Sequence, residues 1–281
     1  MKALFSRGPK RPDFLIVGTM KGGTTQLYNF VTLHPDVERA SSKEIHYFTL
    51  YYDKGEEWYL NHFPSKPNKL SGEASPTYFH CAETSTIPAM IRRMNERMKI
   101  ILIVRDPVER AVSHYNHFCK VNKFPDVMSL DINEFFNIPF SEIITRSTSL
   151  GFYAEQAVSF SLYLRKYLSY ESIFKQDGIL VISTQSLRDT PFETMKKVYE
   201  FLGIHYVKSN QFKVIGYTHG TDLSKLDRPT YTRLAELFYP DYEKFCNKTG
   251  VKYTELNLSA LNPTADPPAE LNAREMPGNA R

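Results

Sequence analysis

Residues 14–33 read Phe-Leu-Ile-Val-Gly-Thr-Met-Lys-Gly-Gly-Thr-Thr-Gln-Leu-Tyr-Asn-Phe-Val-Thr-Leu, and this stretch predicts a strand, a glycine loop and a helix in succession. The apolar run Phe14–Val17 is too short for a helix and is typical of a strand buried on both faces. Gly22 and Gly23 mark a loop in which the backbone can approach a ligand without a Cβ in the way. A helix begins at Thr24 or Thr25, with its apolar residues at helical spacing.

A glycine loop that leads into a helix N-terminus is one way in which proteins bind anions, through backbone N–H groups and the helix dipole. Lys21 precedes Gly22 and Gly23, whereas the loop of nucleotide triphosphatases has its lysine directly after the second glycine. The order here favours a phosphate or sulfate site of another kind. The alternative is a glycine-containing turn that carries an exposed lysine.

The composition bounds the class of protein. The chain has 281 residues, 42% of them hydrophobic, and a net charge of +4. That length suits one large α/β domain, or at most two small ones. The mild basic excess fits a small anionic ligand better than a nucleic acid, which calls for dense Lys/Arg clusters. The three cysteines are widely spaced without a Cys-x-x-Cys pair, which argues against a disulfide framework.

Both ends of the chain are expected to lie outside the domain. Residues 1–12 are basic and are not followed by an apolar run, so we interpret them as an N-terminal extension rather than a signal peptide. No stretch is apolar enough to predict a membrane span, and we expect a cytoplasmic protein. Residues 255–281 contain Asn, Ala and Pro without periodicity and predict a disordered tail. The domain is therefore expected over residues 13–254.

A second buried strand is predicted over Lys99–Val104, followed by Arg105 and a helix from Pro107 to about Val121. The carboxyl end of such a strand is where open α/β sheets bind ligands. A triphosphatase would be expected to place an aspartate there to hold magnesium, so Arg105 favours an anion bound without metal. The alternative is that Arg105 forms a structural ion pair with Asp106 or Glu109.

Residues 43–48, Lys-Glu-Ile-His-Tyr-Phe, are expected to be extended. Alternation would then place Glu44, His46 and Phe48 on one side and the other two apolar residues on the opposite side. Two ionisable groups on one face suit a site, although a solvent-facing edge would give the same pattern. His114 and His117 have a spacing that could hold a metal, but no carboxylate or cysteine nearby completes a ligand set, and we predict none.

The remaining pattern predicts further α/β elements. Residues 124–148 are irregular and are a candidate region for acceptor recognition, with a short helix at 132–136. The other expected elements are a strand at 178–183 and helices at 55–63, 84–97, 149–168, 189–203 and 228–246.

Two separate motifs resemble those of one enzyme family. Val17-Gly-Thr-Met-Lys-Gly-Gly-Thr-Thr25 resembles the 5′-phosphosulfate loop of sulfotransferases that use 3′-phosphoadenosine 5′-phosphosulfate (PAPS). Leu102-Ile-Val-Arg-Asp-Pro-Val-Glu-Arg-Ala-Val-Ser-His-Tyr115 resembles their 3′-phosphate motif, and residues 43–48 match as well. The likeness extends over about residues 13–250 and is nearest to the heparan-sulfate-type branch and its soluble bacterial relatives. It implies a three-layer α/β fold, with a central, mostly parallel sheet flanked by helices as in P-loop-like proteins.

The resemblance also implies roles for residues of this chain. Lys21 would contact the bridging and sulfuryl oxygens of PAPS, and Glu44 would be the catalytic base, with His46 on the same face to orient it or the acceptor. His114 is the alternative base. The remaining donor-binding residues would be Gly22, Gly23, Thr24 and Thr25 around the 5′-phosphate, and Arg105 and Ser113 at the 3′-phosphate. No metal is required in this chemistry.

Two departures from the family pattern bear on the acceptor. Ala74 stands where glycan-modifying members have a lysine, and their late basic Lys-Gly-Arg loop is missing from residues 216–221, with Lys225 as a candidate substitute. We therefore expect transfer to a hydroxyl of a small molecule, a lipid or a carrier-bound natural product. The alternatives are a glycan O- or N-sulfotransferase, a nucleotide kinase, and a non-catalytic module that binds sulfate or the desulfated product 3′-phosphoadenosine 5′-phosphate (PAP).

Overall fold

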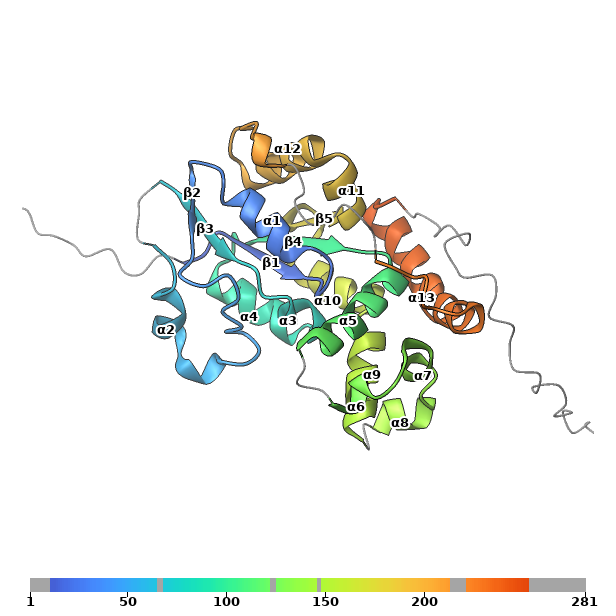
Figure 1. Cartoon of the computed structure of the whole chain (residues 1–281). Coiled ribbons are helices and arrows are strands. Elements are labelled where there is room, and N and C mark those ends of the chain that lie inside the picture. Colours follow the sequence, from blue (N-terminus) through green and yellow to red (C-terminus); the bar gives the residue numbers. More distant parts are fainter. Residues whose placement is uncertain (1–10, 65–67, 122–124, 146–147, 213–220, 253–281) are drawn as a thin grey trace, which may run out of the picture.

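The computed structural model describes residues 11–64, 68–121, 125–145, 148–212 and 221–252 (Figure 1). Residues 216–220 of the late loop, the tail expected from residue 255 and most of the N-terminal extension lie outside the described residues.

A single sheet of five strands, with every neighbouring pair parallel, forms the centre of the molecule (Figure 1). Its order is β2-β3-β1-β4-β5, so the two strands that carry the predicted motifs lie side by side in the middle. The strands are β1 (Phe14–Gly18), β2 (Val37–Arg39), β3 (Leu70–Glu73), β4 (Lys99–Val104) and β5 (Ile179–Ser183). Central strands buried on both faces explain the continuous apolar runs in β1 and β4.

Helices cover both faces of this sheet, which confirms the expected three-layer α/β architecture. Alternation along β1 sends Phe14 and Ile16 to one face and Leu15 and Val17 to the other. The first face packs against α1 (Thr24–Val31), α11 (Thr184–Asp189) and α12 (Pro191–Leu202). The second packs against α2 (Glu56–Leu60), α3 (Thr77–His80), α4 (Thr86–Met94), α10 (Leu164–Phe174) and the end of α13 (Arg228–Thr249).

A third apolar cluster lies beside the sheet rather than on it. It joins the long helix α5 (Pro107–Val121) to the first half of α13 and to a group of short helices. These short helices are α6 (Pro125–Met128), α7 (Ile132–Phe136), α8 (Phe140–Thr145) and α9 (Ser149–Ser159). Figure 1 shows α6 to α9 gathered below α5, away from the sheet.

The structure confirms the predicted bounds of β4, α5 and α7, and it corrects one helix. The helix expected over residues 149–168 is two helices, α9 and α10. The chain turns between them, where the Asp241 carboxylate on α13 accepts hydrogen bonds from the N–H groups of Tyr163 and Leu164. That carboxylate caps a helix start from a distant part of the chain, which local periodicity cannot reveal.

Within the described residues, none of the helices combines the length and the apolar character that crossing a membrane would require. Cys81, Cys119 and Cys246 are free thiols.

Candidate active site

The loop between β1 and α1 folds back against the end of β4. The Thr19 N–H donates to the Ile103 carbonyl at 2.7 Å, and the Gly22 N–H donates to the Thr19 carbonyl at 2.9 Å. Lys21 and Gly23 have positive φ angles of 66° and 99°, so the chain makes two left-handed steps before the helix begins. This conformation suits Gly23, which has no Cβ, and Lys21 is half-buried in the loop.

Gly22 is required by close packing inside the loop. A Cβ at this position would lie 2.3 Å from Thr19 Oγ1 and 2.8 Å from the Ile103 carbonyl oxygen. The Thr184 hydroxyl, at the start of α11, holds the loop from the other side, 2.6 Å from the Gly22 carbonyl oxygen. Thr184 was not predicted from the sequence, although a residue directly after a buried strand lies where α/β sheets bind ligands.

The first turn of α1 is open. Its N-cap residue is Gly23, no side chain caps the helix, and Thr24 is buried. Among the described residues the N–H groups of Thr24 and Thr25 have no protein acceptor. Unpaired N–H groups at a helix start, next to a glycine loop, form a site for an anion. Gly22, Gly23, Thr24 and Thr25, the residues predicted to form the cradle, thus lie at an open helix start.

His80 is a further support of this loop that the sequence did not predict. The Met20 N–H donates to His80 Nε2 at 2.8 Å, and the imidazole is buried against the Phe160 ring. Burial lowers the pKa of His80 well below its usual value, and the charges of Arg110 and Lys166 lower it further. The ring is therefore neutral and keeps the lone pair that the Met20 N–H requires.

Several cations converge on the loop. The pKa of Lys21 is lowered by burial and then by the positive charges of Lys120, Arg105 and Arg110. Like charges repel one another, and a bound dianion would relieve that repulsion. Electrostatics and the open helix turn thus favour the same kind of ligand.

Arg105 is at the carboxyl end of β4, as predicted, and 6% exposed. Its Nε donates to the Glu109 carboxylate at 2.9 Å, and one terminal nitrogen lies 3.5 Å from the Lys21 carbonyl oxygen. The ion pair with Glu109 was the structural alternative for Arg105. The guanidinium also reaches the loop, so this pair does not exclude contact with a ligand. Ser113 is half-buried on α5, two turns beyond the start of that helix.

Glu44 and His46 lie together, as expected, but the extended segment proposed for them is wrong. His46 has a φ of +55°, which breaks the alternation, and Phe48 is buried with Tyr47 instead of sharing a face with Glu44. His46 Nε2 lies 3.3 Å from a Glu44 carboxylate oxygen, and the Lys43 ammonium pairs with the other oxygen. Lys43 Nζ also donates to the Thr25 hydroxyl at 2.7 Å, so it links Glu44 to the start of α1.

The charges around Glu44 set its protonation. Burial raises its pKa, but hydrogen bonds from His46 and Lys43 outweigh burial and lower the pKa to about 2. The carboxylate is therefore ionised at neutral pH. The pKa of His117, which is exposed on α5, is lowered by burial and by the charge of Lys21 and raised by the charge of Glu44.

A buried carboxylate, Glu73, holds the Glu44 segment in place. Glu73 Oε2 accepts from the Ile45 N–H at 3.0 Å and from the Ser75 hydroxyl, while Oε1 accepts from the hydroxyls of Tyr59 and Tyr78. Ser75 Oγ in turn accepts from the His46 N–H at 2.9 Å. Glu73 and Ser75 flank Ala74, but no local sequence pattern predicts that they support the Glu44 segment.

His114, the alternative base, is placed unfavourably for proton transfer. It is 1% exposed, and its Nδ1 lies 3.3 Å from a terminal nitrogen of the fully buried Arg110. Burial lowers the pKa of His114 well below its usual value, and the Arg110 charge lowers it further. Ala74 is fully buried and donates its N–H to the Lys43 carbonyl, and Lys225 is exposed.

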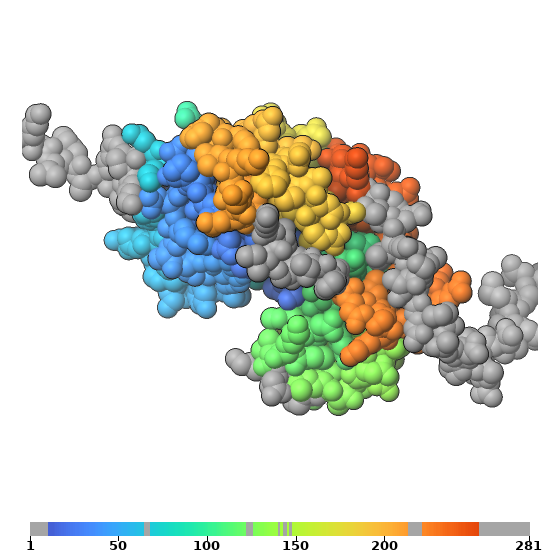
Figure 2. All heavy atoms as spheres, turned by 45° about the horizontal axis from the view of Figure 1, so that its top comes forward, coloured from blue at the N-terminus to red at the C-terminus, as the bar shows by residue number. Residues whose placement is uncertain are grey.

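The N-terminal part of the chain and the helices that follow β4 form two parts of the surface (Figure 2). Figure 2 shows the green helices α5 to α9 as a lobe below the blue N-terminal part of the chain, with a notch between them. A parallel α/β sheet with an open helix start, a loop lysine and converging cations defines an anion-binding α/β protein of the group-transfer type.

Comparison with known proteins then identifies the family. The sequence profile of the sulfotransferase domain matches residues 11–252, and the chain belongs to that family. This is the family that the sequence motifs predicted.

Individual relatives agree with this assignment. Human heparan sulfate glucosamine 3-O-sulfotransferase 3A1 is 30% identical over 88% of this chain, which spans 63% of that relative's length. A solved sulfotransferase from Alicyclobacillus acidocaldarius superposes with a TM-score of 0.70 at 21% identity, over 87% of this chain and 98% of its own. A sulfotransferase domain from the curacin biosynthetic pathway superposes with a TM-score of 0.51 at 12% identity, over 88% of this chain and 100% of its own. These two structures support the fold.

Proposed function

We propose that this protein transfers a sulfuryl group from PAPS to an acceptor hydroxyl, with Glu44 as the general base. The observation that carries the proposal is the open start of α1, with its unpaired N–H groups and the buried cations beside it. That cradle has the kind of donors that the 5′-phosphosulfate requires, and a Cβ at Gly22 would clash with Thr19 and Ile103 and distort the loop.

The reaction needs positioning and charge stabilisation more than covalent catalysis. The acceptor oxygen forms a bond to sulfur while the bond from sulfur to the 5′-phosphate oxygen breaks, and PAP leaves. Lys21, in the loop between β1 and α1, stabilises the charge that develops on the leaving oxygen. The acceptor proton passes to the Glu44 carboxylate.

In this scheme Lys43 controls how basic the Glu44 carboxylate is. A carboxylate with a pKa of about 2 is ionised but is a weak base. When the Lys43 ammonium turns from Glu44 toward the negative charge of the bound donor, Glu44 loses a hydrogen bond and becomes more basic. Donor binding would therefore prepare the base, since Lys43 contacts both Glu44 and Thr25 in the free protein.

For the acceptor we propose a small molecule, a lipid or a carrier-bound natural product. Ala74 is buried, so that position cannot present the cation found in glycan-modifying members. Three apolar or aromatic side chains shortly after His46 are exposed instead, at Leu50, Tyr51 and Tyr52. The proposal includes a cytoplasmic location and no requirement for metal.

A glycan is the second candidate acceptor. It is favoured by the 30% identity to a protein named as a heparan sulfate 3-O-sulfotransferase. Lys43, whose carbonyl accepts from the Ala74 N–H, supplies a cation close to the position of the missing lysine. The two candidates differ in charge, which makes them separable by salt dependence as well as by product.

The first experiment is calorimetric titration of the full chain with PAP, with and without magnesium, and with ATP as competitor. We expect metal-independent PAP binding, at least about tenfold weaker in Gly22→Ala because the loop must open, and unchanged in Gly178→Ala on the far side of the sheet. Absence of PAP binding, or a preference for magnesium-ATP, would favour the kinase alternative and overturn the proposal.

The second experiment measures transfer of labelled sulfuryl from PAPS to a panel of hydroxyl compounds and to N-sulfated heparan sulfate oligosaccharides. Transfer to uncharged or lipid hydroxyls supports the first acceptor class, and transfer to the oligosaccharides alone supports the second. PAP binding without transfer to any acceptor, together with a Glu44→Gln variant that retains biological function, would support a non-catalytic binding module.

A further inference from the structure

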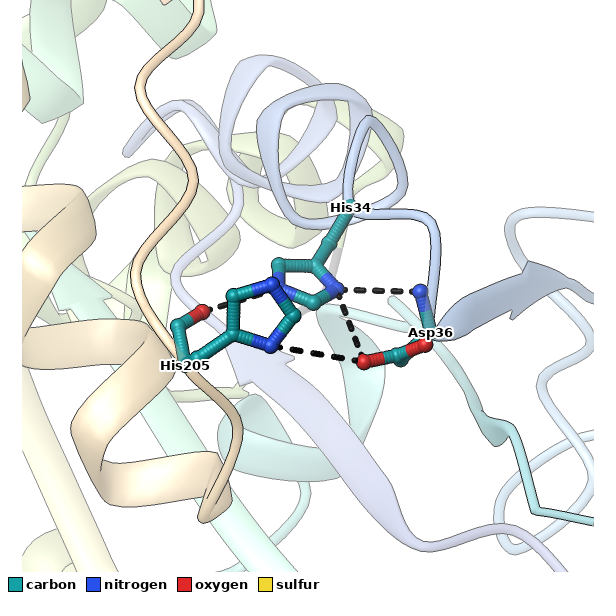
Figure 3. Close-up of side chains that lie close together, drawn as sticks. All are labelled: His34, Asp36 and His205. Carbon is teal, nitrogen blue, oxygen red and sulfur yellow. Dashed lines mark hydrogen bonds and ion pairs between the residues drawn. The ribbon is translucent and has the colours of Figure 1, made fainter.

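Three potential metal ligands meet at the end of α1 farthest from the cradle. His34 follows the last turn of α1, Asp36 precedes β2, and His205 follows α12 (Figure 3). One ligand atom of each lies within 4.8 Å of the others. This cluster lies at the opposite end of the helix from Thr24, about 12 Å away along an eight-residue helix.

The His34 ring is fixed in the tautomer that a metal ligand needs. Its Nε2 is 2.8 Å from the His205 carbonyl oxygen, and since a carbonyl can only accept, Nε2 carries the proton. The ring lone pair is therefore on Nδ1, where it accepts a hydrogen bond from the Asp36 N–H at 3.0 Å. Metal-bound histidines commonly donate their other N–H to a backbone carbonyl in this way. The ring is buried, with its side chain fully inaccessible, and packs edge-on against Tyr199.

The Asp36 carboxylate lies between the two imidazoles. The same oxygen, Oδ2, is 3.9 Å from His34 Nδ1 and 3.6 Å from His205 Nδ1 (Figure 3). In a tetrahedral site with zinc–ligand bonds of 2.0–2.2 Å, neighbouring ligand atoms lie roughly 3.3–3.5 Å apart. These two distances are longer by a few tenths of an ångström, and the ligand atoms of the two imidazoles lie within 4.8 Å of each other. The Asp36 and His205 side chains, 45% and 66% exposed, are free to move closer to His34.

We infer that His34 Nδ1, Asp36 Oδ2 and His205 Nδ1 form a binding site for a divalent transition-metal cation of the zinc type. Two imidazoles and one carboxylate are a donor set that zinc accepts, and water would complete the coordination. The metal takes the place of the Asp36 N–H at His34 Nδ1, and that amide, in a half-exposed residue, bonds to water instead.

The consequence of this site is structural rather than catalytic. The cation would join the turn between α1 and β2 to the segment after α12, two parts of the chain that are about 170 residues apart. A ligand that binds only the folded protein stabilises it by mass action. The site is independent of the proposed sulfuryl transfer, because it lies at the other end of α1 from the loop that would hold the donor.

The test uses the chelator-treated full chain, titrated with Zn²⁺ by calorimetry and with Co²⁺ by visible absorption. We expect one bound equivalent, and a rise in the thermal unfolding midpoint on addition of Zn²⁺. Asp36→Asn and His205→Ala should each weaken binding at least tenfold and remove most of the thermal shift. These two residues are partly exposed, so both variants should fold.

His62→Ala is the matched control, since it removes one partly exposed histidine that interacts with the Trp58 carbonyl and lies outside the cluster. It should leave both readouts unchanged. The inference is overturned if Zn²⁺ does not bind at about 0.1 mM, a weak affinity for a three-ligand site. It is equally overturned if Asp36→Asn and His205→Ala bind Zn²⁺ as tightly as the control.

Discussion

The two ends of α1 contrast with each other in how their polar groups are satisfied. At the N-terminal end Gly23 offers no cap, and the N–H groups of Thr24 and Thr25 have no acceptor in the described part of the chain. At the C-terminal end the Thr32 side chain donates to the Tyr28 carbonyl, and both nitrogens of His34 are paired.

This difference separates binding from stability within one eight-residue helix. A helix end that is buried without partners costs free energy unless a ligand supplies them, so an open end beside several cations indicates a binding site. An end whose groups are all paired stabilises the fold and offers nothing to an anion. Changes at the open end should therefore alter ligand binding and rate, and changes at the closed end should alter stability.

The largest expected effect is on the rate, from Glu44→Gln. The amide keeps the shape of the side chain but cannot take the acceptor proton, so kcat should fall by ~10²–10⁴. PAP affinity should stay close to that of the unmodified protein, because Glu44 contacts the donor only through Lys43. Single-turnover transfer from PAPS and PAP calorimetry provide the two readouts, with Glu57→Gln on the exposed face of α2 as the control. An unchanged rate would remove Glu44 from the reaction.

The pH profile sharpens this prediction. A base acts when it is deprotonated, so the rate falls as the pH drops through its pKa. In kcat/KM for PAPS, which reports the pKa of the protein before the donor binds, the lowered Glu44 pKa of about 2 should give the unmodified protein no loss due to Glu44 above about pH 4. Lys43→Ala removes one of the hydrogen bonds that lower this pKa, and should move the acid limb toward the usual range of a glutamate, near 4.5.

Arg105→Ala should have the next largest effect, on donor binding. If Arg105 binds the 3′-phosphate, as the family motif implies, its removal should weaken PAP binding by roughly 10- to 100-fold. Adenosine 5′-phosphate, which lacks that phosphate, should lose much less affinity. The matched variant is Glu109→Gln, which breaks the ion pair of Arg105 but leaves its guanidinium in place. If the pair is only structural, the two variants should weaken PAP binding equally.

His34→Leu tests the closed end of α1. The variant removes two hydrogen bonds of a buried ring, which should lower the free energy of unfolding by about 1–3 kcal/mol. PAP affinity of the folded protein should not change. Urea unfolding and PAP calorimetry measure the two effects, with His62→Leu as the control. A large loss of PAP affinity in His34→Leu would show that the two ends are coupled.

Much of the fold and of the open end could be predicted because the signals are local. The continuous apolar runs of β1 and β4 predict buried parallel strands, and Gly22, Gly23 and Pro107 mark the turns and helix starts that follow. The cradle residues and Arg105 were predicted on this basis, and the structure places them around one loop.

The supports of the site could not be predicted in the same way. The supporting contacts join residues that are 28 to 162 positions apart in the sequence, so no local pattern predicts them; they come from Glu73, His80 and Thr184. The prediction for residues 43–48 failed because the Glu73 and Ser75 side chains hold that backbone in an irregular path, with His46 at a positive φ. Tertiary hydrogen bonds override a strand-like pattern there.

The start of α5 is a third helix terminus, and its N–H groups are satisfied differently from those at the start of α1. Here Asp106 caps the helix itself, since one of its carboxylate oxygens accepts from the Glu109 N–H at 2.9 Å, and the Tyr239 hydroxyl lies 3.3 Å from the other. Unlike the start of α1, this end needs no ligand. Burial raises the pKa of Asp106 to about 7, with the Glu109 charge also raising it, although hydrogen bonds oppose the rise.

A carboxyl whose pKa is higher in the folded than in the unfolded protein stabilises the fold at low pH, where it is protonated in the folded state. This contribution is lost as the pH rises through about 7. Between about pH 5 and pH 8 the unmodified protein should lose on the order of 2 kcal/mol of stability through Asp106.

Asp106→Asn keeps the hydrogen-bond acceptor but cannot ionise, so its urea unfolding free energy should fall less over this range. Asp227→Asn, at the capped start of α13, should retain the pH dependence of the unmodified protein. If Asp106→Asn instead retains the full pH dependence, the Asp106 carboxylate is ionised over this whole pH range. Arg105, which pairs with Glu109, is then the candidate for the positive charge that balances it.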